Sequence, residues 1–287
     1  MDLPYDGAQL RAYAYLAPLA RSLESQCFSI LRCSSCRLYF QELVADSAES
    51  ALLYNTYAGR QPAPPARPLA ELAHFAEDAM ISRLLFPQHR PVVLDYGMNT
   101  GNWAAMARAY DCDVWGTDIK EQSKDIAERR GITYSPPSLL PESHFDFINA
   151  DQVFEHLSDP LTTLRTLAKS LKPGGKMKIS TPHDRHLAVK IQRAKAGAYD
   201  PAAFIRAFES MWPLLHLNLF ETANLQIMAH KAGLSPYRVP LAIGYAAMTL
   251  FDTPRQWNRN LYNPFKRWLA RGTWQYFQQS ASPPDKA

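Results

Sequence analysis

Two acids and two glycines lie at a spacing that suits a nucleotide site. Asp95 falls near the end of an apolar, β-branched run, and Gly97 and Gly101 follow in the next loop. Such a run indicates a buried parallel strand, and glycines after it let the backbone approach a ligand closely. A second short strand, expected over residues 112–117, leads to Asp118. A carboxylate about 20 residues beyond the glycine loop can accept the hydroxyls of a ribose. The pattern predicts a nucleotide site at the carboxyl edge of a doubly wound sheet.

The glycine loop resembles motif I of the class I S-adenosylmethionine (SAM) methyltransferases, in which an acid precedes three alternating glycines. Asp95, Gly97 and Gly101 match that motif, and Asn99 stands where the middle glycine is usual. Asparagine tolerates a left-handed backbone better than other residues with a side chain, so we expect the turn to form. A dinucleotide-binding loop has Gly-x-Gly-x-x-Gly spacing, whereas the spacing here is Gly-x-x-x-Gly. The loop therefore favours SAM over NAD.

A second block resembles the same family more closely. Phe145-Asp146 opens an expected strand, Glu155-His156 and Asp159-Pro160 follow it, and Leu-Lys-Pro-Gly-Gly spans residues 171–175 before the next strand. Glycine and proline there are typical of a helix end. The resemblance covers about residues 70–240, and it is similar to the branch that includes the ubiquinone-pathway O-methyltransferases.

The resemblance implies SAM as the cofactor and contacts to it from Asp95, Gly97, Asn99, Gly101, Asp118, Ile119, Asp151 and Gln152. Asp118 would bind the ribose, with a helix N-cap as the alternative role. Ile119 would lie against the adenine. Asp151 and Gln152 follow the fourth strand, where they face the cofactor or the acceptor, or only form a turn.

Three histidines are candidates for the base that deprotonates an acceptor: His156, His183 and His216. Histidine titrates near neutral pH, which suits it to this role. His156 lies in the Glu-His motif, and His183 follows the fifth strand at the ligand edge. His216 lies in a Pro-x-x-His segment that also resembles the family. A purely structural role is the alternative for each of them.

The N-terminal cysteines lead us to predict no metal. Cys33 and Cys36 resemble one knuckle of a zinc module found in some relatives, but the other knuckle is absent and leaves only Cys27 nearby. A closed structural zinc site needs four ligands. We predict a degenerate, metal-free module with free thiols.

Alternating apolar runs and helical patterns predict an α/β fold with a Rossmann-like, seven-stranded, doubly wound sheet. Strands are expected near residues 91–96, 112–118, 132–135, 144–150, 174–181, 234–240 and 243–251, with helices near 101–110, 120–130, 160–171 and 220–231. The family resemblance implies that the last strand is antiparallel.

The predicted organisation has three parts. Residues 1–60 form a small N-terminal module, and a proline-rich linker over 61–68 precedes the methyltransferase core at 69–252. Within that core, residues 184–219 are too long for a simple loop, so we expect a helical lid over the acceptor. Residues 253–287 form an aromatic and basic tail. The tail is expected to pack as a helix with a solvated basic face, and a peripheral membrane or partner contact through it is left open.

Composition narrows the classes of function. The chain has 287 residues, of which 47% are hydrophobic, and a formal net charge of +4. That is enough for a large domain and a smaller one. No dense basic stripe is present, so we predict no nucleic-acid partner. No apolar run reaches the about 18 residues that span a bilayer. The apolar run at 12–20 contains Pro18 and follows two acids, which argues against a signal peptide and for the cytoplasm.

These observations predict a SAM-dependent methyltransferase that acts on an O, N or C nucleophile of a small-molecule acceptor. Two alternatives stay open. One is an NAD-binding oxidoreductase. The other is a non-catalytic partner protein with the same fold, because Asn99 departs from the motif and residues 135–140 lack the acid that many members place near the adenine.

Overall fold

The chain folds into two compact units, which differ in size and in the kind of sheet they contain. The first comprises residues 1–66, 155–158 and 182–224, and the second comprises 67–154, 159–181 and 225–287. The computed structural model describes residues 16, 19, 29–46, 48–50, 52–54, 69–120, 122–248, 254–269 and 274–280. Cys27, the linker at 61–68 and most of the run at 12–20 lie outside these described residues.

The second unit is built on the seven-stranded sheet that the sequence predicts. Its strand order is β5-β4-β3-β6-β7-β10-β9. The strands are β3 (Val92–Tyr96), β4 (Asp113–Thr117), β5 (Thr133–Tyr134), β6 (Phe145–Asp151), β7 (Leu171–Ser180), β9 (Leu234–Tyr237) and β10 (Trp274–Gln279). The first five are parallel, and β10 runs antiparallel to both β7 and β9. The predicted Rossmann-like fold and its antiparallel last strand are therefore confirmed.

Two details of the predicted sheet are wrong. Residues 241–246 form helix α11 (Leu241–Ala246) instead of a strand at 243–251, and the seventh strand is β10, which lies within the segment expected as a tail. The Lys-Pro-Gly-Gly stretch lies inside β7 rather than before it. It forms a bulge in β7. Phe145 of β6 pairs with Leu171, and Phe147, two residues later, pairs with Lys176, five residues after Leu171.

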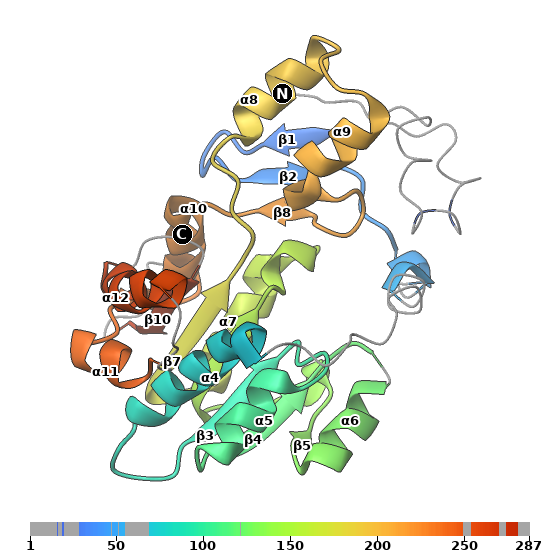
Figure 1. Ribbon diagram of the computed structural model, residues 1–287. Coiled ribbons are helices and arrows are strands. Elements are labelled where there is room, and N and C mark those ends of the chain that lie inside the picture. The colour runs from blue at the N-terminus through green and yellow to red at the C-terminus, as the bar shows by residue number, and fades with distance from the viewer. Residues whose placement is uncertain are drawn as a thin grey trace. The chain divides into compact units, whose positions relative to one another are not determined.

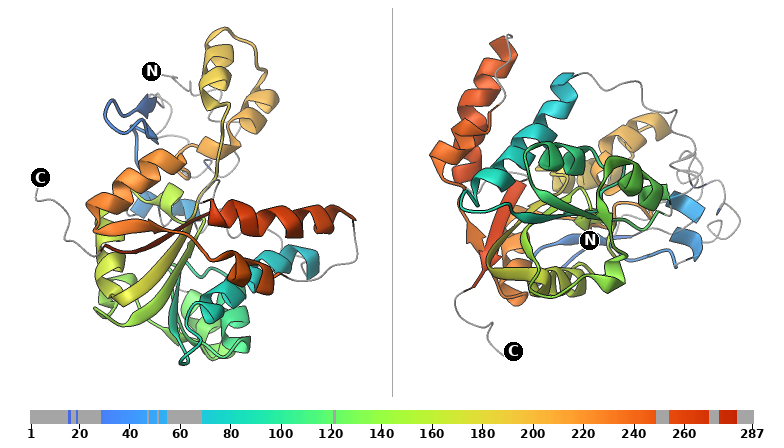
Figure 2. Two further views of the ribbon diagram at one scale, coloured as in Figure 1. Left: turned by 90° about the vertical axis from the view of Figure 1, so that its left-hand side faces the viewer. Right: turned by 90° about the horizontal axis from the view of Figure 1, so that it is seen from below.

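Helices cover both faces of this sheet. In Figure 1, α4 (Leu69–Leu84) and α5 (Asn102–Ala109) lie in front of the strands and α7 (Pro160–Ser170) lies behind them. The other helices of this unit are α6 (Gln122–Arg130), α10 (Thr222–Lys231) and α12 (Pro254–Trp268), with a short turn of 3₁₀ helix at Pro137–Leu139. α11 packs against α4 and α12, as both views of Figure 2 show.

Asp146 ties the start of β6 to its neighbours. Its Oδ2 accepts the backbone N–H of Val92 at 2.8 Å and the Nζ of Lys172 at 2.8 Å, while its Oδ1 lies 3.1 Å from Nε2 of His89. These groups come from the segment before β3, from β3 and from β7. The aspartate of the Phe-Asp motif therefore has a structural role. It joins neighbouring segments at the edge of the sheet opposite the glycine loop.

The first unit is smaller and has its own apolar core. β1 (Ile30–Arg32), β2 (Tyr39–Gln41) and β8 (Asn218–Leu219) form an antiparallel sheet. α8 (Leu187–Lys195), α9 (Pro201–Ala207) and a 3₁₀ turn at Glu209–Met211 complete it. The core contains Phe204 and Phe208, whose rings stack at 4.6 Å. These two aromatic side chains of the expected lid therefore pack in the core of this unit.

We predict that Asp146→Asn lowers the free energy of unfolding by about 1–3 kcal/mol at pH 7, the usual cost of weakening charged hydrogen bonds. Burial would raise the pKa of Asp146, but bonds from Lys172, Val92 and His89 hold this pKa below its ordinary value. Such a group stabilises the fold above its unfolded pKa, and that stability is lost as the pH falls through its folded pKa. Urea unfolding should therefore show the difference between wild type and variant shrinking below about pH 4.

The exposed Asp113→Asn on β4 is the matched control, and its stability should follow the wild type. A difference for Asp146→Asn that persists unchanged at low pH would mean that packing, and not charge, is what the substitution disturbs.

Candidate functional site

The loop after β3 takes the conformation that its glycine pattern requires. Gly97, Asn99 and Gly101 have φ values of 80°, 46° and 68°, so the expected left-handed Asn99 is confirmed. The N–H groups of Gly97 and Met98 donate to the carbonyl of Thr117 at 2.9 and 3.0 Å, which ties the loop to the end of β4. A side chain at residue 97 would collide with Val153, because an added Cβ would lie 2.4 Å from its Cγ2. Glycine is therefore needed there for space as well as for backbone angle.

Asp118 lies at the end of β4, as predicted, and organises the loop. Its Oδ2 accepts the backbone N–H of Asn99 at 2.8 Å, and its Oδ1 accepts that of Lys120 at 3.0 Å. The residue is 9% exposed, whereas Ile119 beside it is 70% exposed.

A cavity of about 290 Å³ opens beside this loop. It is lined by His74, Phe75, Asp95, Gly97, Met98, Asn99, Thr100, Asn102, Trp103, Asn149, Asp151 and Gln152. The cavity brings together most of the predicted cofactor residues, from the ends of β3 and β6. Asp118, Ile119 and Gly101 are not among its lining residues.

Acidic groups dominate one part of the cavity wall. Asp95 is 4% exposed and its Oδ1 accepts a hydrogen bond from Asn149 Nδ2 at 2.9 Å. Burial raises the pKa of Asp95 to about 7; the Asn149 bond opposes this shift and the nearby Asp151 carboxylate adds to it. The amide Oδ1 of Asn149 is buried without a hydrogen-bond partner among the described residues. The wall thus offers acceptors and negative charge to a cationic group.

A buried lysine, which the sequence analysis did not single out, lies behind this wall. Lys178 on β7 is 1% exposed, and its Nζ lies 2.6 Å from Asp78 Oδ2 and 3.2 Å from Asp151 Oδ1. Asp151 also accepts a hydrogen bond from Ser180. A lysine inside a strand gives no motif signal, and its partner Asp78 comes from α4, far away in sequence.

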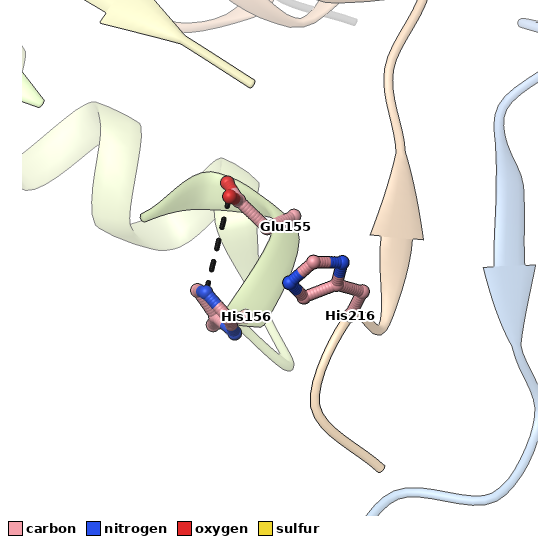
Figure 3. Close-up of side chains that lie close together, drawn as sticks. All are labelled: Glu155, His156 and His216. Atoms are coloured by element: carbon pink, nitrogen blue, oxygen red, sulfur yellow. Dashed lines mark ion pairs between the residues drawn. The ribbon is translucent and has the colours of Figure 1, made fainter. Parts of the chain in front are cut away.

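A second group of titratable residues lies in the first unit. Glu155, His156 and His216 approach one another as Figure 3 shows, with His156 Nε2 3.8 Å from Glu155 Oε1. One ligand atom from each lies within 4.8 Å of the others, so this trio has the composition and closeness to hold a divalent cation. His156 Nδ1 lies 2.8 Å from the carbonyl of Leu215, and a hydrogen bond there leaves the lone pair on Nε2. His183, in contrast, is exposed and accepts a 3.3 Å bond from Arg185.

A buried glutamine holds the segment that carries His216. The side-chain Nε2 of Gln41 donates to the carbonyls of Trp212 at 2.8 Å and His216 at 3.0 Å, and its Oε1 accepts from Leu214 N–H at 2.8 Å. Burial, followed by the nearby His156, lowers the pKa of His216 to about 4. His216 is therefore neutral at pH 7. Sequence reasoning missed Gln41, since one glutamine in a strand carries no signal.

The predicted degenerate zinc knuckle forms the turn between β1 and β2. The backbone N–H of Cys36 donates to Cys33 Sγ at 3.5 Å, and both thiols are free. The hydrogen bonds from Cys36 and Ser35 lower the pKa of Cys33. The absence of zinc stays a prediction.

A comparison with known protein families gives a match that includes the glycine loop and the ends of β3 and β6. Residues 62–239 match the methyltransferase domain. The chain belongs to this family. The resemblance to SAM-dependent methyltransferases that the motifs predicted is thereby confirmed at the level of the family.

The similar proteins are distant. A ubiquinone biosynthesis O-methyltransferase from Idiomarina loihiensis is 31% identical over 100 residues, 31% of this chain and 41% of that protein. A demethylmenaquinone methyltransferase from Bacillus licheniformis is 26% identical over 127 residues, 35% of this chain and 55% of that protein. The chain thus spans about half the length of these curated relatives.

A solved structure with a similar fold is a 1,6-didemethyltoxoflavin-N1-methyltransferase from Burkholderia thailandensis. It is 16% identical, with 89% of this chain and 96% of that chain covered and a TM-score of 0.48.

We predict that Gly97→Ala destabilises the second unit by about 1–3 kcal/mol, because it adds strain at positive φ and a clash with Val153. Val153→Ala in the same chain removes the clash but not the backbone strain, so it should restore part of the lost stability. Thermal unfolding of the two single variants and the double variant measures this. Strictly additive losses in the double variant would show that the Cβ and Val153 do not meet.

Proposed function

We propose that this chain transfers the methyl group of SAM to an O, N or C nucleophile of a small-molecule acceptor. The observation that carries the proposal is the loop at 97–101, with its three left-handed residues, tied to Asp118 beside an acid-walled cavity. When bound, SAM supplies a sulfonium methyl group, which is already a strong electrophile. The protein's tasks are then to bind, to orient and to exclude water.

The residues of the cavity fit this cofactor. The unpartnered Oδ1 of Asn149, with Asp95 and Asp151 nearby, suits a ligand that carries positive charge and hydrogen-bond donors. Gly97 and Asn99 leave the backbone of the loop open to close approach. An NAD-binding site would want a different glycine spacing, and the family match supports the methyltransferase over that alternative.

Each predicted cofactor residue receives a role in this proposal. Asp118 accepts the ribose hydroxyls while it holds Asn99, since each carboxylate oxygen has more than one lone pair. Ile119 covers the adenine ring. Gly101 ends the loop and starts α5, and Gln152 borders the cavity near the methionine end.

His156 is the strongest of the three candidate bases. Its Nδ1 is held by the carbonyl of Leu215, and Glu155 lies near its Nε2, where it would stabilise the imidazolium formed by proton uptake. His216 has a lowered pKa and is a weaker base, and exposed His183 lacks a group that orients it as firmly. We therefore assign proton removal from the acceptor to His156.

A small acceptor is favoured by the names of the similar proteins. One is named for ubiquinone biosynthesis and another for demethylmenaquinone. Phe208 is buried in the core of the first unit, so it does not line an acceptor site. Contacts from residues 184–219 to the acceptor would instead come from half-buried side chains such as Trp212.

We further propose a cytoplasmic location and no nucleic-acid partner. The helices that the structure describes include none with both the length and the apolar character to cross a membrane. On α12, Leu261, Tyr262 and Phe265 are exposed by 59, 60 and 45%, which supports a peripheral membrane or partner contact through this helix. Arg267 at the end of this helix is buried, in contrast to the solvated basic face expected of the tail, and is bound to Asp78 at 3.0 Å.

We predict that Asp118→Ala weakens SAM binding by about 1–3 kcal/mol, or about 5- to 150-fold, through lost charge-assisted hydrogen bonds. Calorimetric titration with SAM measures the change. Asp125→Ala, an exposed acid on the neighbouring α6, is the control and should bind as the wild type does. If Asp118→Ala keeps its fold and its SAM affinity, Asp118 has no place in the cofactor site.

A further inference from the structure

Four neighbouring strands of the second unit carry a polar residue at the same level. Asp95 on β3 pairs with Asn149 on β6, Asn149 with Lys178 on β7, and Lys178 with Tyr276 on β10. Residues paired directly across a sheet point to the same face. The four residues, which we call the polar row, therefore cross the interior of the sheet from the cofactor loop to the C-terminal strand.

Charged partners on the helices complete the polar row. Asp78 of α4 binds Lys178 Nζ at 2.6 Å, Arg267 of α12 at 3.0 Å and the hydroxyl of Tyr276 at 3.4 Å. Arg267 also lies 3.5 Å from Glu77. Breaking a buried ion pair by removing one partner leaves an uncompensated charge and is strongly destabilising. A cluster of this kind keeps its members in fixed places.

Asp151 is the point at which this cluster reaches the cavity. It lines the cavity, and its side chain is 20% exposed where that of Lys178 is 1% exposed. Lys178 and Ser180 both donate to Oδ1. Its Oδ2 accepts no hydrogen bond from the described residues, so one oxygen is fixed from behind and the other is left for a ligand.

We propose that Lys178 is a positioning residue, which Asp78 and Arg267 hold in place and which itself holds the Asp151 carboxylate toward the ammonium group at the methionine end of the bound cofactor. This inference rests on the proposed function, because it needs SAM in the cavity. Lys178 contacts neither the ligand nor the reacting atoms and acts through Asp151.

The electrostatics of the row agree with this arrangement. Burial alone would lower the pKa of Lys178, but Asp151 and Asp78 raise it, so the lysine stays charged. The groups around Asp95 are Asn149 and Asp151 from β6, Lys178 from β7 and the backbone of Ala104 from α5. His74 of α4 lines the same cavity.

These charges give SAM binding a defined pH dependence. The pKa of Asp95 is raised to about 7, mainly by burial, so the residue gains its negative charge as the pH rises through neutrality. A cationic ligand binds the ionised form better, so SAM affinity should rise between about pH 6 and 7.5 with release of a proton. Loss of the Lys178 charge should move this rise to higher pH, since Lys178 lowers the pKa of Asp95.

The test compares two ligands across this pH range by calorimetry. SAM carries the ammonium group of its methionine end, and 5′-methylthioadenosine lacks that end. Lys178→Met keeps the length of the side chain without its charge, and Lys176→Met, two residues earlier on the same strand, is the control. We expect Lys178→Met to weaken SAM binding about tenfold or more at pH 7 and to shift its pH profile upward, while methylthioadenosine binding stays within about twofold. Lys176→Met should match the wild type for both ligands.

A further variant keeps the proposal testable if Lys178→Met does not fold. Asp151→Asn should show the same selective loss of affinity for SAM. Equal losses for both ligands in a folded Lys178→Met or Asp151→Asn, or an unshifted profile, would overturn the positioning role alone. A wild type that binds neither ligand would overturn the proposed function and this inference with it.

Discussion

The burial of Lys178 is the constraint on which the second unit depends. An ammonium group that is 1% exposed demands carboxylates close by, and Asp78 and Asp151 supply them from α4 and β6. Asp78 in turn needs Arg267 and Tyr276, so the C-terminal helix and strand become part of the same cluster. α4, α12 and β10 are thereby fixed behind one wall of the cavity, and the strand order β7-β10-β9 places the chain's last described strand beside β7.

The same charges connect the fold to the chemistry of the cavity. Asp95 of the polar row and Asp151, which is bound to Lys178, place carboxyl groups at the ends of β3 and β6, where ligands collect in open α/β sheets. The left-handed loop at 97–101 then presents backbone groups to the same space. Binding and folding share one set of interactions there, which is why the residues that hold the sheet together also shape the ligand site.

Local signals explain which features the sequence predicted. β3, β4 and β6 were found within a residue or two because their apolar runs end in glycine or acid, and Asn99 was expected in the left-handed conformation because of its residue type. The partnerships of Lys178 and Gln41 could not be predicted, because each depends on residues that only the tertiary fold brings near. β10 was missed for a related reason. Its residues read as an aromatic and basic tail, and only the edge offered by β7 makes them a buried strand.

The central claim is that the cavity beside the 97–101 loop is built for SAM. One calorimetric titration of the wild-type chain with SAM, and a second with NAD⁺, test it most directly. The account predicts saturable binding of SAM at one site per chain and no binding of NAD⁺. Binding of NAD⁺ that SAM cannot displace, or a folded protein that takes up neither ligand, would contradict it.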